Sequence, residues 1–230
     1  MKRFLAMVLL LTLLSASALG ERFAPENMAQ ARRQAMDLLQ TCAFTGGSGD
    51  EEREIIIRWV EPIRVCAAGM PNSKDLKQLD DFLLQLNYRV PEMPMITRVE
   101  TPEEANLVIH YCKLSEMTEL VPGYEEGNWG MVTYSYHSNG QVFSAVIGLA
   151  RDKTSQTARN HLMREELTGA LGLTGHHDAF SDSILYRPWT TVQHLSEVDW
   201  MMLNMLYSPH VFPGWTWTQV QQALLTHYKP

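Results

Sequence analysis

The chain has 230 residues, of which 45% are hydrophobic and 20% are charged, and its formal net charge is −7. This length is enough for one large domain with a sizeable core. The acidic balance argues against nucleic acid and against anionic membrane surfaces as partners.

The first 20 residues have the pattern of a secretory signal peptide. Lys2 and Arg3 precede an apolar run over 4–14, and small residues follow over 15–20. That run is too short to span a bilayer, which takes about 20 residues. We therefore expect an exported protein, periplasmic or secreted, with no membrane span after cleavage. Removal of residues 1–20 takes away Lys2 and Arg3 and leaves a net charge of about −9.

Three cysteines, Cys42, Cys66 and Cys112, remain after this cleavage. In an exported protein, one disulfide with one thiol left over is the simplest expectation. The sequence does not choose among the three pairings. None of the cysteines has C-x-x-C spacing, so a metal site built on them is not expected.

Residues 21–52 are interpreted as an N-terminal helix and a loop. The segment 26–39 is amphipathic, and a polar, glycine-rich stretch follows over 45–52. A β-branched run over 55–60 indicates a strand, which continues over 63–67 beyond a bend at Pro62.

The middle of the chain alternates helix and strand signals. Ser73 can cap a helix over 74–86, and Pro91 and Pro94 interrupt an extended segment after it. Strand patterns follow over 106–111, 131–136 and 142–150, and Asn139-Gly140 is typical of the hairpin turn between the last two.

The stretch 160–178 combines a buried helix with acidic and imidazole groups. Glu165 and Glu166 lie within an otherwise apolar helix that Gly172 ends as a C′ residue. His176, His177 and Asp178 follow directly after this stop. Carboxylates on a helix that leads into a His-His-Asp turn indicate a variant or a remnant of a metal site.

These residues resemble the metzincin metalloproteases, the matrixin group especially, which carry H-E-x-x-H-x-L-G-L-x-H here. Aligned on residues 170–173, the first ligand His becomes Glu165 and the catalytic Glu stays as Glu166. The second ligand His becomes Gly169, and the third falls on Gly175, one residue before His176. The zinc motif is therefore degenerate, while the helix and its glycine stop are kept.

The resemblance continues downstream of the motif. Residues 183–188, Ser-Ile-Leu-Tyr-Arg-Pro, are similar to the S-I-M-Y-P Met-turn, and Leu185 replaces the Met. Residues 195–207 are similar to the L-S-x-x-D…L-Y helix that closes such domains. The chain is also similar to an uncharacterised family of secreted bacterial proteins with an E-E-x-x-x-x-L-G-L helix. The residues that would shape the turn are Gly172, Leu185, Tyr186 and Pro188.

The resemblance implies an α+β, zincin-like fold in which a mixed sheet packs on the helices at 74–86 and 156–171. The expected divisions are a signal peptide over 1–20, an N-terminal helix and loop over 21–52, a zincin-like domain over 53–208 and an extension with a short helix over 209–230. Thr216 and Gln219 have capping-box spacing for that last helix.

Two functions compete on these residues. The first is a non-catalytic binding or assembly module of the cell envelope, with a protein or peptide partner and no cofactor. The alternative is an atypical metal-dependent peptidase with Glu166 as base, with metal ligands drawn from His161, Glu165, His176 and His177, and with zinc as the metal. His161 and Glu165 share a helix face at i, i+4 spacing.

Simpler interpretations stand beside both. Arg164, Arg187 or backbone donors can hold the two glutamates, and Arg187 is the expected partner of Glu166. Such an ion pair would depress the pKa of Glu166. His161 is expected to be partly exposed, and the two histidines after the helix are expected on a surface turn. The late tryptophans Trp189, Trp200, Trp215 and Trp217 indicate core packing or an aromatic groove.

Overall fold

The structure, a computed structural model, describes residues 25–45 and 52–228, so the signal-peptide prediction lies outside the described residues. The strands form one six-stranded sheet in the order β1-β6-β4-β2-β3, and β5 pairs with β6 off this path. All pairs are parallel except β5 with β6. The strands are β1 (Arg58–Trp59), β2 (Ile63–Gly69), β3 (Ile96–Val99), β4 (Leu107–Cys112), β5 (Gly130–Tyr136) and β6 (Gln141–Ala150).

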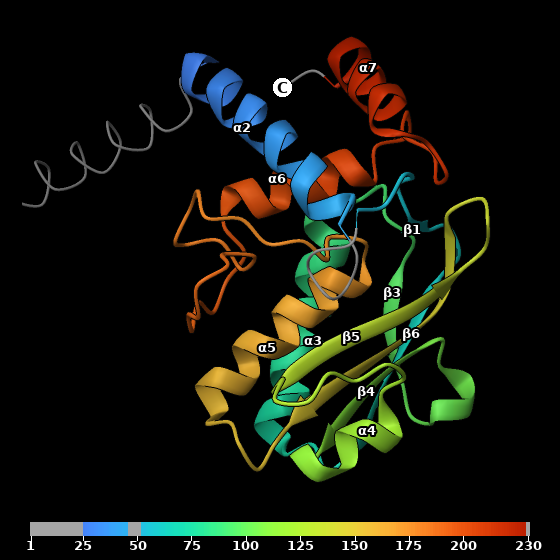
Figure 1. The fold of residues 1–230 in the computed structure, drawn as a ribbon, viewed down its shortest axis with the longest axis vertical. Coiled ribbons are helices and arrows are strands. Elements are labelled where there is room, and N and C mark those ends of the chain that lie inside the picture. Colours follow the sequence, from blue (N-terminus) through green and yellow to red (C-terminus); the bar gives the residue numbers. More distant parts are fainter. Residues whose placement is uncertain (1–24, 46–51, 229–230) are drawn as a thin grey trace, which may run out of the picture.

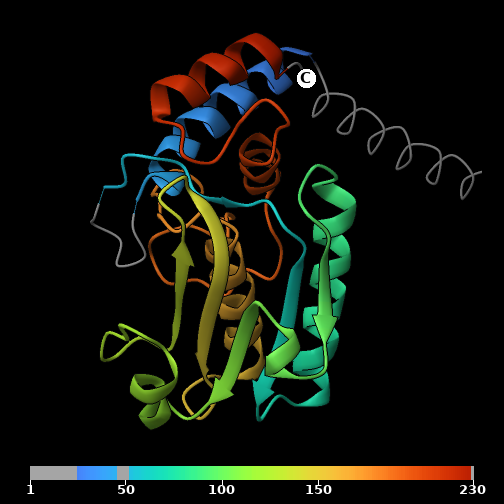
Figure 2. The same cartoon turned by 90° about the vertical axis from the view of Figure 1, so that its right-hand side faces the viewer.

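Helices cover one face and one end of this sheet, and the short α4 (Met117–Leu120) packs against β6 on the other face (Figures 1 and 2). Helices α3 and α5 pack on each other and on the sheet, whereas α2, α6 and α7 gather at one end. The expected mixed sheet on two helices, with further helices at both ends of the chain, is confirmed. The helices are α2 (Pro25–Ala43), α3 (Ser73–Arg89), α4 (Met117–Leu120), α5 (Gln156–Ala170), α6 (Glu197–Leu206) and α7 (Trp217–His227), with 3-10 turns at Pro102–Glu104 and Leu114–Glu116.

The core lies between the sheet and α3, α5 and α6. On β4, Leu107, Ile109 and Tyr111 are buried and alternate with half-buried residues, as the two-residue period of a strand requires. Burying one such aliphatic side chain contributes about 1.5–3 kcal/mol. Helix α2 belongs to the same core, because Ala35 and Leu39 are fully buried in it. None of the described helices is long and apolar enough to cross a membrane.

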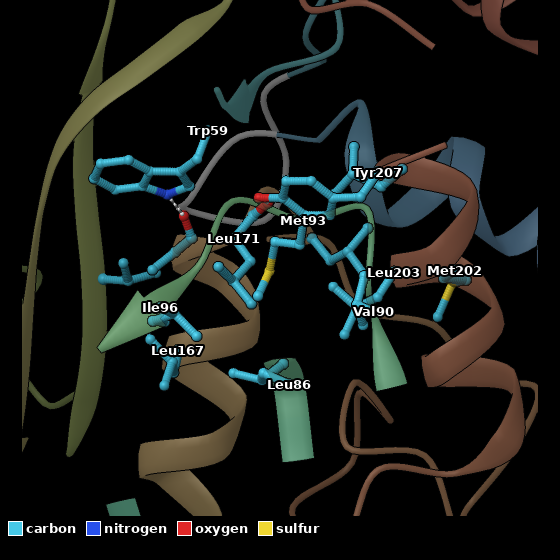
Figure 3. Close-up of a cluster of buried hydrophobic side chains, with 14 of the residues drawn as sticks. Trp59, Leu86, Val90, Met93, Ile96, Leu167, Leu171, Met202, Leu203 and Tyr207 are labelled. Carbon is cyan, nitrogen blue, oxygen red and sulfur yellow. Dashed lines mark hydrogen bonds between the residues drawn. The ribbon is translucent and has the colours of Figure 1, made fainter. Parts of the chain in front are cut away.

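The C-terminal end of α5 is fixed by side chains from two other elements (Figure 3). The last carbonyls of a helix have no partner within it and need outside donors when they are buried. Here Trp59 Nε1 donates to the Ala170 carbonyl, and the Tyr207 hydroxyl donates to the Leu171 carbonyl, both over 2.9 Å. Gly172 follows with a φ of 115°, so the predicted glycine stop is confirmed.

Two local predictions are corrected by the structure, and a third, the extended segment after Pro94, is refined. Asn72, not Ser73, caps α3, because its side chain accepts from the Lys74 and Asp75 N–H groups. The strand expected over 55–60 shortens to β1, and Ile56 instead exchanges backbone hydrogen bonds of 2.8 Å with Gly214 and Trp215. The extended segment after Pro94 contains β3, which pairs with β2.

The edge of the sheet at β3 is closed by a side chain from α3. Asn87 accepts a hydrogen bond of 3.0 Å from the Ile96 N–H and donates one of 2.8 Å to the Ile96 carbonyl. Unpaired edge groups invite pairing with other chains, and a side-chain amide that satisfies both groups removes part of that risk.

The tip of the hairpin between β5 and β6 touches the segment that precedes α7. The predicted turn is present, and its Gly140 has a φ of 79°. A Cβ at Gly140 would lie within 2.6 Å of the Ile56 carbonyl and also against the Gly214 N–H. The C-terminal segment therefore closes against residues early in the chain. The capping box predicted at Thr216 and Gln219 is present at the start of α7.

The expected disulfide is not formed. All three cysteines are free and buried. Cys66 lies opposite Val108 in the register of β2 and β4, so Cys112 is four residues farther along, or about 13 Å. A disulfide needs Cα atoms within about 7 Å. Cys42 lies on α2, where burial raises the pKa of its thiol to about 12.

We expect Gly172→Ala to destabilise the protein by about 3 kcal/mol. Its positive φ is strained for alanine, and the added Cβ would lie 2.7 Å from the Ile57 carbonyl. Gly127→Ala is the matched control, because Gly127 has a φ of 100° with nothing within 4 Å. Its cost should be about 1 kcal/mol. Chemical denaturation of both variants measures the difference, and equal losses would contradict the close contact at Gly172.

Candidate functional site

A pocket of about 400 Å³ opens between β5, α5 and the turn that follows α5. Glu166 lines this pocket. The lining residues come from three segments: Glu125, Gly127, Asn128, Trp129, Gly130, Met131 and Val132; Leu162, Glu165, Glu166, Gly169, Leu173, Thr174 and His176; and Leu185 and Trp189.

Two imidazoles hold the carboxylate of Glu165 on the wall of this pocket. His176 Nε2 lies 2.9 Å from Glu165 Oε1, and His161 Nε2 lies 3.3 Å from Oε2. Burial acts to raise the pKa of Glu165, but the hydrogen bonds from His161 and His176 outweigh it and hold that pKa below its usual range. The sequence-predicted His161, Glu165 and His176 therefore come together.

A backbone carbonyl fixes the orientation of the His161 ring on the side away from Glu165. Its Nδ1 lies 2.8 Å from the Val192 carbonyl, which can only accept, so Nδ1 carries a proton and Nε2 faces Glu165. His161 is only 2% exposed, so the expectation of a partly exposed residue is wrong. Its ring also meets Trp189 edge to face, with centroids 5.5 Å apart.

Glu166 occupies a different environment from its neighbour. It packs against β5 so closely that a Cβ at Gly130 would lie 2.7 Å from its Oε1. The Val132 N–H donates to its carboxyl group. Burial, and then the negative charge of Glu165, raise the pKa of Glu166 well above its usual range and favour the neutral acid.

The expected ion pair between Glu166 and Arg187 is wrong. Arg187 lies on the exposed turn, with Nε 3.4 Å from Asp178 and Nη2 3.2 Å from the His176 carbonyl. Arg164 turns to the Asn160 carbonyl and to Gln78. The pKa of Glu166 is consequently raised, not depressed, because no cation offsets its burial.

His177 lies in a buried hydrogen-bond chain, away from the Glu165 group. Its Nδ1 accepts from the Ala179 N–H, so Nε2 donates to Ser183 Oγ over 3.1 Å. The Ser183 hydroxyl then donates to Asp199 on α6 over 2.5 Å. With an exposed fraction of 4%, His177 is not the surface residue that was expected. This chain ties the turn after α5 to α6.

The turn residues predicted beside the motif differ in how deeply they are buried. Leu185 is 1% exposed and forms part of the pocket wall, which is the place of a core residue. Tyr186 bridges to His177 through the backbone, whereas Pro188 is exposed. Asp199 holds the turn by accepting also from the Ile184 N–H over 3.0 Å.

The residues present do not fit a bound metal as they are arranged. Two imidazoles and a carboxylate are a donor set that suits zinc, iron or manganese. Yet both Nε2 atoms point at the oxygens of Glu165 and already contact that carboxylate. Within residues 25–45 and 52–228, no group of three or more His, Cys, Asp or Glu residues could hold a metal ion.

Two exposed tryptophans frame the pocket mouth, and the sequence signalled only one of them. Trp129 and Trp189 are 43% and 56% exposed, and their rings meet at 81° with centroids 6.0 Å apart. Trp189 belongs to the late aromatic group, of which Trp200 is buried in the core. Trp129 precedes β5, and only the fold brings it here.

The chain is thus a mixed α/β protein with a carboxylate pocket at the antiparallel edge of its sheet. Over residues 33–226 it matches the family described as "Protein of unknown function (DUF2927)", and it belongs to that family. No curated protein matches it. Nineteen chains of solved structures do, among them "Structure of Myroilysin", with 12% identity, a TM-score of 0.40, and coverage of 66% of this chain and 82% of that chain.

The two glutamates should respond to pH with opposite sign. The raised pKa of Glu166 gives a contribution to stability that is present in acid and is lost as the pH rises through the folded-state pKa. We therefore expect the melting temperature of Glu166→Gln, relative to the native chain, to rise with increasing pH. Thermal denaturation from about pH 4 to pH 9 measures this difference.

Glu165→Gln provides the matched comparison. The lowered pKa of Glu165 gives stability that is present at neutral pH and is lost as the pH falls through the folded-state pKa. This variant should cost about 2 kcal/mol at neutral pH, where it loses charged hydrogen bonds, and less in acid. If the stability of both variants, relative to the native chain, changed with pH in the same direction, the pKa values of the two carboxyl groups would not be shifted in opposite directions.

Proposed function

We propose that this chain is a non-catalytic binding module that holds an extended peptide segment of a partner against the edge of β5. The observation that carries the proposal is the position of this edge beside the pocket. Trp129 accepts from the Ala150 N–H, so the alternation along an antiparallel pair turns the backbone groups of Gly130, Val132 and Tyr134 away from β6. In the described residues, no other strand pairs with β5.

The pocket can add sequence specificity to the backbone pairing that the edge of β5 offers. Backbone pairing gives affinity to an added strand, and pockets for alternate side chains give specificity. The exposed rings of Trp129 and Trp189 offer large apolar surfaces to one side chain of the partner. Glu166 already satisfies the Val132 N–H, so the outward groups of Gly130 remain for the partner.

We also propose that the fold has a zincin-like layout and that the protein is exported to the cell envelope. The order of strand, helix, strands, long helix, irregular turn and final helix from β2 to α6 supports the layout. The pattern of residues 1–20 supports export. The cluster of His161 and His176 around Glu165 favours binding over catalysis, since both imidazoles already contact that carboxylate.

A library of extended decapeptides tests the binding proposal. We expect Trp189→Ala to weaken the tightest peptide at least tenfold, because an aromatic anchor at the centre of an interface contributes about 2 kcal/mol or more. Tyr88→Ala on α3 is the control, since that ring is 86% exposed and does not line the pocket. Fluorescence anisotropy gives the affinities.

Amide hydrogen exchange locates the bound peptide. The amides of Gly130 and Tyr134, which face away from β6, should exchange more slowly in the complex, because a pairing strand protects them. Absence of peptide binding, or protection confined to other strands, would refute the proposal. Equal losses in Trp189→Ala and Tyr88→Ala would do so as well.

The alternative function, an atypical metallopeptidase, is favoured by one observation. An imidazole held at Nδ1 by a carbonyl, as His161 is by Val192, is also the usual arrangement behind a metal ligand. In the binding module, the purified chain should contain no stoichiometric metal and should not bind added zinc tightly. Elemental analysis and calorimetry measure both properties.

If the chain bound one zinc ion that was lost in Glu165→Gln and kept in His194→Ala, the binding-module hypothesis would be rejected in favour of the metallopeptidase. His194 is exposed and lies outside the pocket, so its substitution controls for surface binding of the metal.

A further inference from the structure

The parallel strands β2, β4 and β6 end within one residue of the same register, at the end of the sheet where α4 lies (Figure 1). Strand β2 ends at Gly69, β4 at Cys112 and β6 at Ala150, and the residues that follow are Met70, Lys113 and Arg151. These three residues, with Asp152 and Arg159, line a hollow of about 370 Å³. The carboxyl ends of parallel strands are the usual place for ligands in such sheets. None of these residues lines the pocket beside β5.

Backbone hydrogen bonds hold the walls of this hollow together. The Met70 N–H donates to the Tyr111 carbonyl, and the Arg151 N–H donates to the Cys112 carbonyl, both over 2.8 Å. Asp152 Oδ1 accepts from the Leu114 N–H over 2.8 Å. The segments that carry Lys113 and Arg151 are therefore fixed relative to each other.

The floor of the hollow is a buried arginine. Arg159 is 5% exposed, and its Nε lies 2.8 Å from the buried carboxylate of Asp75. Its Nη1 donates to the Thr154 carbonyl and its Nη2 to Gln156, each over 3.0 Å. These contacts fix the guanidinium and neutralise most of its charge locally.

Lys113 and Arg151 are different, because the ion pairs of the described residues involve neither of them. Because Asp75 already offsets the charge of Arg159, Lys113 and Arg151 are the two unpaired cations of the hollow, and Asp152 is the one carboxylate in its lining. The chain as a whole has a net charge of −7. A hollow that presents positive charge concentrates anions locally, even on a chain that is acidic overall.

We propose that this hollow binds the phosphate group of a phosphate ester. The planar guanidinium of Arg151 suits two phosphate oxygens at once, and the ammonium of Lys113 adds a second positive charge. Two unpaired cations match the double charge of a phosphate monoester. Met70, which is 44% exposed, gives the group attached to the phosphate an apolar neighbour.

Titration with inorganic phosphate, followed by calorimetry, tests the site directly. We expect saturable binding that weakens as the salt concentration rises. Arg151→Gln and Lys113→Gln should each reduce the affinity about tenfold, because each removes one charged hydrogen-bonding group. Both residues carry exposed or half-exposed side chains, so the folded structure should survive these changes. Arg33→Gln is the matched control, since Arg33 is exposed on α2 at the other end of the sheet.

Two further probes identify the source of the phosphate group. Glycerol phosphate represents a soluble monoester, and vesicles that contain phosphatidic acid, compared with phosphatidylcholine alone, represent a lipid headgroup with a monoester phosphate. Binding of either anionic probe that is lost in Arg151→Gln supports the site and names its source. No saturable binding of phosphate up to about 10 mM would overturn the proposal. Binding that persists in the Arg151→Gln, Lys113→Gln double variant, or that falls equally in Arg33→Gln, would also overturn it.

Discussion

The buried C-terminal end of α5 is the constraint on which the rest of the structure depends. Its last carbonyls lie away from water, so the fold must bring donors to them. Trp59 comes from β1 and Tyr207 from the end of α6, which joins the sheet and the closing helix at one point. Gly172 then turns the chain toward His176. The position of Glu165 in the pocket follows from this junction.

The pKa values of two adjacent carboxyl groups on one helix shift in opposite directions because their surroundings differ. Glu165 meets two imidazoles, whereas Glu166 meets an apolar strand and a single backbone N–H. Glu166 at β5 also parallels Asn87 at β3, since each side chain satisfies backbone groups at one edge of the sheet. The edges of this sheet are thus controlled by side chains from its own helices.

The sequence predicts the parts of this protein that depend on local pattern. The period of apolar residues locates α3 and α5, and the glycine after Leu171 locates the helix end. The i, i+4 spacing places His161 beside Glu165. Partners that are distant in the sequence could not be predicted this way. The helix cap is Asn72, one residue before the predicted Ser73. Arg187 does not contact Glu166, because the exposed turn directs it toward Asp178. Trp129 reaches the pocket only through the pairing of β5.

The contact between Ile56 and the segment at Gly214 and Trp215 has a consequence for how the chain folds. It closes a loop of about 160 residues, and the Gly140 turn fits beneath it. Contacts of such long range form late and slow the folding of a domain. The residues after α6 are consequently the closing step of the fold, so a chain growing from its N-terminus cannot complete this core until nearly all of it has been synthesised.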